Sequence, residues 1–530
     1  MQGGENLLPY LTEVKNPSKK YSVLFRGINY GEGSQDGEFA ETLNLSTDQY
    51  PCITQRAERL KVDEYTKPTT LHSKAKILVI DETFDEEGNP TGKANVDYGD
   101  NCIGEVTAGK KQTATVGNYI VIFPEKKYYK VPTEDDTDGE FGNMEHTTTV
   151  RNVKFGTNKI YWTGTWDHGL SKGDSVTISN CDIAENNKAE EVIIRGVADN
   201  EITFDANTFT EGEQKTNFME IKRSVPALDF VCESNYRLWG TMGNTIYASA
   251  YGKPLNFKSF EGLAGDSYYI DVASEGAFTG CIPFATHICF FKENTLHKLY
   301  GTKPSNFQIN TSNVYGVQSG SERSMQIINE QLIYKGVGGV YSYTGGVPEL
   351  ISEAFGTQRY SDAVACTDGE KYYLSMRQGN KWNMFVYDVA KNIWLREDDT
   401  HAVDMTFHDG KVYFLEEEGG LYMIDKTADR GDVDWSATFC TIHETINERK
   451  VYSKFHLRMD MSAGAWLAVD IKTDNDTQWR QIYTTHNEKA KTVSIPIIPS
   501  RCDSIDIRLR GKGKCTVKTF IREFTTGSDV

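Results

Sequence analysis

The chain has 530 residues, which is too long for one compact core and predicts roughly two to four domains. Aromatic residues make up 12% of it, and 46 glycines against 14 prolines favour strands joined by tight turns. A net charge of −18 argues against a protein that wraps nucleic acid around its outside, although it is compatible with an acidic lumen. We therefore expect an all-β protein.

Residues 1–65 are expected to form an extended N-terminal arm. Its most unusual stretch, NLSTDQYPCITQRAER (44–59), begins with turn residues, places an aromatic residue before a proline and ends in closely spaced charges. The stretch has no apolar period of about 2 or 3.6 residues, so we expect it to join neither a sheet nor an amphipathic helix. The N-terminus lacks the apolar core of a signal peptide, and no run approaches the ~18 apolar residues of a membrane span, so no membrane contact is expected.

A hairpin pattern recurs through the middle of the chain. Each unit has a short apolar run, a polar or glycine turn and a second run rich in tyrosine. The units start at Tyr236, His287, Gln331, Lys371 and Lys411. A hairpin that recurs about every 40 to 50 residues is typical of β-propeller blades, in which each small sheet buries its faces against its neighbours. Separate β-sandwich sheets would give the same local pattern, but the regular spacing favours the propeller.

Other regions depart from this repeat. An earlier pair of apolar runs, AKILVID (75–81) and NYIVIFPEKKYYKVP (118–132), is interpreted as another blade with a long turn between its strands. Between residues 145 and 226, short alternating strands separated by KGD and DN turns predict a small β-barrel inserted between blades. After about residue 432, alternating segments with polar turns predict a β-sandwich.

The expected architecture is therefore a β-propeller with an inserted small β-barrel and a C-terminal β-sandwich. Its segments are the arm (1–65), a first propeller part (66–144), the insertion (145–226), the remaining blades (227–431) and the sandwich (432–530). The number of blades stays open, because insertions interrupt the N-terminal ones.

No catalytic, cofactor-binding or metal-ligating residue is predicted. The carboxylates at 398–399 and 416–418 are the candidates for the paired acids of a glycosidase, but they fall in expected solvated turns. The sequence also lacks the short motifs that sialidase-type propellers repeat. The aspartate cluster 425–434 lacks the terminal glutamate of a calcium loop and is expected to be a linker. The ten cysteines show neither CxxC pairs nor zinc spacing, so reduced thiols are expected.

Three segments together resemble tail and virion proteins of tailed phages that infect Firmicutes and related gut bacteria. Residues 25–60, FRGINYGEGSQDGEFAETLNLSTDQYPCITQRAERL, resemble their opening, in which a GEF…NLS…YP…R…R segment precedes a propeller. RLWGTMGNTIYASAYGKPLNF (237–257) is similar to their first blade, and IPIIPSRCDSIDIRLRGKGKCTV (495–517) to their closing sandwich.

This resemblance implies a role like that of the tail-nozzle and packaged-DNA stabilisation proteins of short-tailed phages, although a long-tailed phage would share much of the pattern. Copies of such a protein form a homo-oligomeric ring, expected to be a hexamer, below the portal and adaptor, with fibres and other tail proteins as neighbours. DNA would pass through the lumen without sequence-specific binding. The protein would be assembled in the bacterial host cytoplasm and end in the tail of the virion.

The arm offers a contact between subunits of such a ring, because a propeller leaves little free edge. Tyr50 and Pro51 would be apolar anchors on a neighbour, and Arg56, Glu58 and Arg59 would be charged grips. The alternative is that the arm packs along its own propeller as a closing strand or belt.

The expected function is that of a non-enzymatic nozzle or hub ring that retains and conducts the packaged genome. One alternative is a propeller enzyme or glycan-binding tail protein that acts on host surface polysaccharide. A second alternative is an intracellular kelch-like adaptor, which the segment FVYDVAKNIWLRED (385–398) suggests through its Tyr-Asp strand and following Trp.

Overall fold

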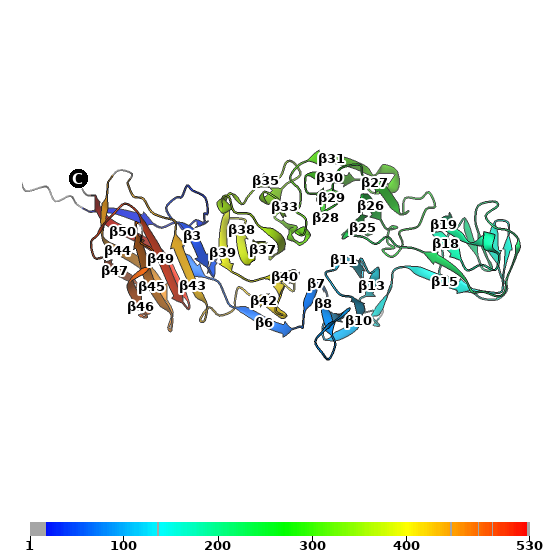
Figure 1. The fold of residues 1–530 in the computed structure, drawn as a ribbon, viewed down its shortest axis with the longest axis horizontal. Helices are drawn as coiled ribbons and strands as arrows, with labels where there is room; N and C mark the ends of the chain where they lie inside the picture. Colours follow the sequence, from blue (N-terminus) through cyan, green and yellow to red (C-terminus); the bar gives the residue numbers. More distant parts are fainter. Residues whose placement is uncertain (1–16, 135–136, 446–447, 475, 490, 527–530) are drawn as a thin grey trace, which may run out of the picture.

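The computed structural model describes residues 17–526, apart from 135–136, 446–447, 475 and 490. Figure 1 shows three parts in a row: a two-sheet sandwich at one end, a ring of small sheets in the middle and an inserted domain at the other end. Among the described residues, seven four-stranded sheets follow one another around the ring. The fold is a seven-bladed β-propeller with an insertion and a sandwich, and the predicted fold class is confirmed.

Six blades are built from consecutive strands, and the seventh takes its outer strand from the arm. Blade 1 contains β7 (Pro68–Lys74), β8 (Lys76–Phe84), β9 (Pro90–Tyr98) and β10 (Asn101–Thr107). Blade 2 contains β11 (Gln112–Val116), β12 (Tyr119–Phe123), β13 (Lys127–Lys130) and β14 (Glu140–Asn143). Blade 3 contains β24 (Phe230–Ser234), β25 (Arg237–Met242), β26 (Thr245–Ala248) and β27 (Tyr268–Asp271).

The remaining blades follow the insertion in the same way. Blade 4 contains β28 (Gly280–Phe284), β29 (His287–Lys292), β30 (Thr295–Tyr300) and β31 (Gln308–Asn313), with the 3-10 helix η2 (Pro304–Asn306) in a loop. Blade 5 contains β32 (Gln326–Ile328), β33 (Gln331–Gly336), β34 (Gly339–Tyr343) and β35 (Glu349–Leu350), and η4 (Glu353–Phe355) follows it. Blade 6 contains β36 (Ser361–Thr367), β37 (Lys371–Gln378), β38 (Lys381–Asp388) and β39 (Ile393–Asp398). Blade 7 contains β40 (Ala402–His408), β41 (Lys411–Glu416), β42 (Gly420–Ile424) and β6 (Arg59–Glu64).

Apolar side chains fill the space between successive blades. Leu78 of blade 1 shares a buried cluster with Ile120 of blade 2, and comparable clusters join each later pair of blades up to blade 7. A further cluster joins Leu71 of blade 1 to Leu415 of blade 7 and closes the circle. Each blade thereby buries both of its faces, which a lone sheet of this size cannot do.

Strand β6 closes the ring with hydrogen bonds as well. It pairs antiparallel with β42, so that Arg59 lies opposite Ile424 and Glu64 opposite Gly420. Because β6 precedes blade 1 in the sequence and completes blade 7, the first and last segments of the propeller are joined in one sheet. Opening the ring would require breaking this pairing.

The interpretation of residues 75–132 as one blade is wrong. AKILVID lies largely in β8 of blade 1, whereas NYIVIFPEKKYYKVP spans β12 and β13 of blade 2. The strands between them give little apolar signal, because the first half of β9 and most of the outer strand β10 are exposed or half-buried. The sequence pattern of two blades is therefore mistaken for that of a single blade.

A 3-10 helix, η3 (Glu322–Ser324), precedes blade 5 and reaches the first strands of other blades. Arg323 reaches from this helix to the inner strands of other blades, where its Nη1 lies 2.6 Å from Oδ2 of Asp404 in blade 7. Its Nη2 donates to the carbonyl oxygen of Lys111 beside blade 2 at 2.7 Å, and its Nη1 donates to that of Thr69 in blade 1 at 3.2 Å. One side chain thus ties three blades to the loop before blade 5.

The insertion consists of two small sheets around one shared core. The first sheet contains β15 (His146–Val150), β23 (Met219–Arg223), β18 (Ser175–Ser179) and β19 (Lys188–Ile193), with η1 (Ala184–Asn186) before β19. The second contains β20 (Gly196–Ala198), β21 (Glu201–Thr203), β17 (Lys159–Tyr161), β16 (Val153–Gly156) and β22 (Gly212–Gln214). Side chains of both sheets form one buried cluster. At its base, buried Asp174 accepts from Asn256 of blade 3 at 2.8 Å, so the insertion is fastened to the propeller.

The sandwich contains strands from both ends of the chain. Its first sheet contains β4 (Leu45–Ser46), β5 (Ile53–Gln55), β50 (Cys515–Thr526), β44 (Lys450–Met461) and β47 (Thr492–Pro496), with β1 (Ser18–Ser22) on β50 and β48 (Arg501–Cys502) on β44. Its second sheet contains β2 (Gly27–Ile28), β3 (Glu38–Leu43), β43 (Asp434–Phe439), β49 (Ile505–Lys512), β45 (Trp466–Thr473) and β46 (Arg480–Thr485).

The expectation that residues 44–59 would join no sheet is wrong. Residues 1–16 of the predicted arm lie outside the described residues, and much of the rest is paired with the sandwich or with blade 7. Leu45 of β4 and Ile53 of β5 are buried in the sandwich core. Strands of two or three residues need no apolar period, because backbone hydrogen bonds and one buried side chain suffice to hold each of them.

Candidate functional site

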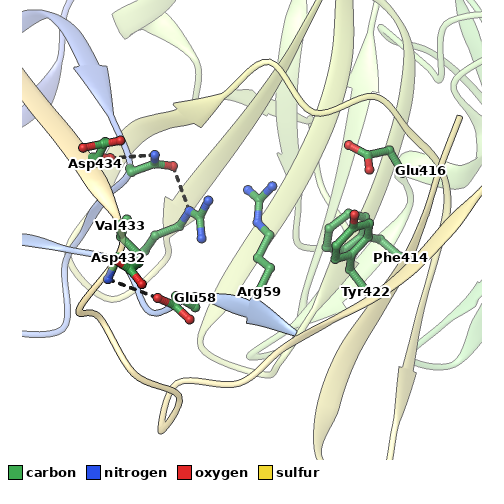
Figure 2. A pocket seen from close by; sticks show the side chains of 10 residues that line it. Glu58, Arg59, Phe414, Glu416, Tyr422, Asp432, Val433 and Asp434 are labelled. Carbon is green, nitrogen blue, oxygen red and sulfur yellow. Dashed lines mark hydrogen bonds between the residues drawn. The ribbon is translucent and has the colours of Figure 1, made fainter. Parts of the chain in front are cut away.

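A cleft lies where the arm, blade 7 and the start of the sandwich meet. Its volume is about 550 Å³, and it is lined by Asn44, Arg56, Glu58, Arg59, Phe414, Glu416, Tyr422, Asp432, Val433 and Asp434. Figure 2 shows Arg59 in the middle of this cleft, between the linker at Asp432 and the paired rings of Phe414 and Tyr422. Three of the five residues predicted for a subunit contact therefore line one cleft.

Arg59 joins the outer strands of blades 6 and 7. Its Nη2 lies 2.7 Å from Oε2 of Glu397 and its Nη1 lies 2.9 Å from Oδ2 of Asp398, both in β39. Its Nη1 also donates to the hydroxyl of Thr400 at 2.6 Å. The guanidinium carbon is 5.3 Å from the centroid of the Phe414 ring, within cation–π range. Since the side chain is only 9% exposed, its charge depends on these partners.

Arg56 ties the arm to the same carboxylates. Its Nη2 lies 3.3 Å from Oδ2 of Asp398, and its Nε donates to Oδ1 of Asn44 at 2.9 Å. Asn44 adopts a φ of 51°, a left-handed conformation that asparagine tolerates better than most residues. In this conformation its backbone N–H donates to the carbonyl oxygen of Glu397 at 2.6 Å, and its Nδ2 donates to that of Asp434 at 2.8 Å. Asn44 and Arg56 thereby connect blade 6 to the sandwich.

The two arginines and two carboxylates form a largely buried network of balanced charge. Burial by itself would lower the pKa of Arg59, but Asp398 and Glu397 outweigh it and raise that pKa. Burial would raise the pKa of Asp398, but Arg59 and Arg56 hold it below its ordinary value. The pKa of Arg56 is lowered, first by burial and then by the charge of Arg59. Asp398 therefore stays ionised and paired at neutral pH, which suits a structural joint better than proton transfer.

A second group of ion pairs holds the turn that follows β4. Oδ1 of Asp48 lies 2.5 Å from Nζ of Lys371 in blade 6, and Oδ2 lies 2.7 Å from Nη2 of Arg430 in the linker to the sandwich. Burial would raise the pKa of Asp48, but Lys371 and then Arg430 overcome it and lower the pKa to about 2. The arm is thus fixed to the propeller and to the linker at two separate places.

Glu58 fixes the linker itself. Its Oε1 accepts the backbone N–H of Asp432 at 3.1 Å, and its own N–H donates to the carbonyl oxygen of Asp429 at 2.8 Å. Residues 425–434 connect β42 of blade 7 to β43 of the sandwich. The position of the sandwich therefore depends on contacts made by the arm.

The far side of the cleft carries a carboxylate of a different kind. Glu416 lies at the end of β41, where burial and the charge of Glu418 raise its pKa. Beside it, the rings of Phe414 and Tyr422 are stacked with centroids 5.4 Å apart. A partly buried carboxylate with a raised pKa in a cleft is a candidate for acid–base chemistry or ligand binding.

The five residues predicted for a subunit contact separate into two groups. Tyr50 and Pro51 lie in the turn between β4 and β5, where Tyr50 is 38% exposed. Arg56, Glu58 and Arg59 contact their own chain in the cleft, in the manner of the belt that the sequence left open as the alternative. The contact of these five residues with a neighbouring subunit stays a prediction.

The partners of the two arginines were not apparent from the sequence. Residues 398–399 are not a solvated turn throughout, because Asp398 ends β39 and its side chain is only 14% exposed. The sequence feature that could have indicated this network is a run of three acidic residues, Glu397 to Asp399, together with two arginines close to each other in the arm. Only the path of the arm across blade 6 brings the two together.

Three other observations bear on the chemistry of the molecule. No group of three or more His, Cys, Asp or Glu side chains suited to a metal ion occurs among the described residues. All ten cysteines are free thiols, and eight of them are buried. Across the part of the chain that the structure describes, no helix has both the length and the apolar character needed to span a membrane.

Comparison with known proteins gives weak similarities of fold. No protein-family model and no curated protein sequence matches the chain. The designed protein Ika8 is 12% identical over 69% of this chain and 99% of its own, with a TM-score of 0.34. BamB from Moraxella catarrhalis is 9% identical over 70% of this chain and 97% of its own, with a TM-score of 0.33. The endosialidase of phage phi92 is 8% identical over 78% of this chain and 75% of its own, with a TM-score of 0.27. At these TM-scores the similarities carry no argument about function.

Proposed function

We propose that this protein is a non-enzymatic structural component of a bacteriophage tail, a nozzle or hub ring that retains and conducts the packaged genome. The observation that carries the proposal is the joint in the cleft. The segment 25–60, which resembles the opening of phage virion proteins, is the one that fastens the propeller to the sandwich. Asn44, Arg56 and Arg59 of this segment bond to blade 6 and to the start of the sandwich.

Such a joint suits a protein that bears mechanical load. Domains in one chain move relative to each other by default unless their interface is extensive. Here the arm contributes strands to both sandwich sheets and to blade 7, and buried ion pairs hold it between them. A ring that resists the pressure of packaged DNA requires subunits that do not hinge.

The centre of the propeller also supports a structural role. The mouth of a ring of loops is a concave place where a ligand site is expected. Arg323 lies among the first strands of the blades, where its bonds to blades 1 and 7 and to the backbone beside blade 2 hold the blades together. The net charge of −18 favours contact with DNA that is weak enough for the genome to slide past.

The proposal is tested on virions of the phage that encodes this sequence. Peptide mass spectrometry of gradient-purified particles should find the chain in several copies per particle, and negative-stain microscopy of the purified protein should show rings. A non-structural protein of the same lysate serves as the control and should be depleted from the particles. Absence of the chain from virions, together with a purified protein that forms no ring, would refute the proposal.

Glu416 favours a second candidate function, that of a propeller enzyme or glycan binder that acts on host surface polysaccharide. Its raised pKa, the neighbouring Tyr422 and an open cleft are compatible with a sugar ligand. The test is release of reducing ends from host capsule by the wild type and by Glu416→Gln, with exposed Glu64→Gln as the matched control. Activity that Glu416→Gln alone abolishes would replace the structural proposal, and no activity in the wild type would count against this candidate.

A further inference from the structure

The outer face of the second sandwich sheet carries a group of cations on two neighbouring strands. Along β49 the buried residues alternate with others that point away from the core, among them Arg508 and Arg510. On the adjacent β45, Asp470 lies directly opposite Arg508, and Lys472 lies two residues further along. These side chains belong to one face of the sheet, because residues two apart on a strand point the same way.

A single carboxylate anchors both arginines. Asp470 is 1% exposed, and its Oδ2 accepts from Nη2 of Arg508 and from Nε of Arg510, each at 2.7 Å. Burial would raise the pKa of Asp470, but the two arginines hold it below its ordinary value. Asp506 of β49 lies opposite Lys472 on the same face. With Arg508, Arg510 and Lys472 against Asp470 and Asp506, the group has three cations and two anions and keeps an excess of one positive charge.

Two tryptophans fix the orientation of these cations. The guanidinium carbon of Arg508 lies 4.5 Å from the centroid of the Trp479 ring, and Nζ of Lys472 lies 4.6 Å from the same centroid. The guanidinium of Arg510 lies 5.6 Å from the ring of Trp466. The arginine side chains remain 28% and 34% exposed. The hydrogen bonds of both guanidinium groups within the described residues are made by Nε and Nη2.

We propose that this surface docks carboxylates of a second copy of the chain. We call it the arginine–tryptophan face and define it by Trp466, Asp470, Lys472, Trp479, Arg508 and Arg510. Guanidinium groups held in place bind carboxylates with little loss of freedom, and arginine and tryptophan are enriched at the centres of protein interfaces.

Charge complementarity selects the partner. The chain has 75 acidic against 57 basic residues, so every copy offers an excess of carboxylates to such a face. The face holds the carboxylates Asp470 and Asp506 among its three cations, and this mixed charge suits a protein surface better than a phosphate backbone of one charge sign. This inference rests on the proposed function in one respect, because both require copies of the chain to associate. It adds which surface of one copy makes the contact.

The test measures self-association of the full-length protein by sedimentation velocity. Lys472→Glu reverses one charge on the face and leaves the Asp470 pairs intact, and it should weaken association about tenfold or more. Trp479→Ala, which removes the stacking ring without changing the charge, should weaken it as well. Arg458→Glu makes the same charge change on an exposed position of β44 in the other sheet and should leave association unchanged. Circular dichroism of each variant confirms that it is folded.

Three results would overturn the inference. They are a wild type that stays monomeric at all concentrations, a Lys472→Glu variant that associates as tightly as the wild type, and Lys472-dependent binding of a fluorescent oligonucleotide in place of self-association. If Lys472→Glu still forms the ring, the arginine–tryptophan face is not the contact between copies, but the proposed function is unaffected. If the chain is absent from virions but still self-associates through this face, the proposed function fails and the inference about the face holds.

Discussion

Arg59 neutralises two carboxylates that would otherwise be shielded from water without a full counter-charge. Replacing it with alanine removes the ion pairs with Glu397 and Asp398, whose side chains are 7% and 14% exposed. Because uncompensated buried charge is costly, we expect Arg59→Ala to lower the free energy of unfolding by ~3 kcal/mol. Urea unfolding followed by tryptophan fluorescence measures this loss.

Lys61 provides the matched control, because it lies on the same strand and makes an ion pair with Glu64 in which both side chains are well exposed. We expect Lys61→Ala to change the free energy of unfolding by less than ~0.5 kcal/mol. Equal effects of the two substitutions would show that the network in the cleft does not stabilise the joint.

Asp48 gives the molecule a dependence on acid pH. Its pKa is lowered from 3.8 to about 2 in the folded protein. A carboxyl whose folded pKa lies below its unfolded value contributes stability that is fully present above the unfolded pKa and is lost as the pH falls through the folded one. We therefore expect the contribution of Asp48 to the free energy of unfolding, ~2 kcal/mol at neutral pH, to disappear between about pH 4 and pH 2.

The comparison of the wild type with Asp48→Asn isolates this effect. The difference in their free energies of unfolding, obtained from urea titrations at a series of pH values, should be greatest at neutral pH and shrink toward pH 2. A difference that stays constant over this range would mean that Lys371 and Arg430 do not depress the pKa of Asp48.

Single residues of the candidate site were only partly predictable from the sequence. Arg56, Glu58 and Arg59 stand out as charges at the end of an aperiodic stretch, and all three line the cleft. Glu397 does not stand out, and the sequence assigns Glu416 to a solvated turn, because acidic residues beside strands are usually solvated. Their significance depends on distances across the fold that no local pattern records.

At the scale of elements, η3 is the clearest case of a short segment with long-range consequences. Arg323 bonds to blades 1 and 7 and to the backbone beside blade 2, and Asp404 beneath it is 5% exposed. We expect Arg323→Ala to lower the free energy of unfolding by ~3 to 5 kcal/mol, because a buried carboxylate and several carbonyl oxygens lose their partner. Thermal and urea unfolding measure this change.

Arg377→Ala is the control for Arg323, because Arg377 makes an ion pair with Asp362 at the surface, where its side chain is 46% exposed. Its removal should cost less than ~0.5 kcal/mol. If Arg323→Ala lowered the free energy of unfolding as little as this control, the bonds of Arg323 would not stabilise the contact between blades.

Elements with a strong apolar period were predictable and the others were not. The five hairpins from Tyr236 to Lys411 correspond to blades 3 to 7, because each of these blades has at least one central strand with few or no exposed residues. Outer strands such as β10 and the short strands β4 and β5 lack that signal. The sequence therefore predicts no sheet for residues 44–59, with a closing strand on the propeller only as an alternative, and it merges the first two blades into one.

At the scale of the whole molecule, the chain is fastened by segments that are distant in sequence. The ring is closed by β6 from the arm, and the sandwich combines strands from residues 18–55 with strands after residue 434. The order of propeller, insertion and sandwich follows from changes in the repeat along the sequence. The closure of the ring does not follow from these changes, since it depends on the pairing of β6 from the arm with β42 of the last blade.

The most direct test of the proposed function is a cryo-electron microscopy reconstruction of the tail of the purified virion. We predict a closed ring of copies of this chain around the path of the DNA, with the joint between propeller and sandwich unchanged in every copy. A tail without this chain, or copies held singly at a fibre tip with polysaccharide in the Glu416 cleft, would contradict it.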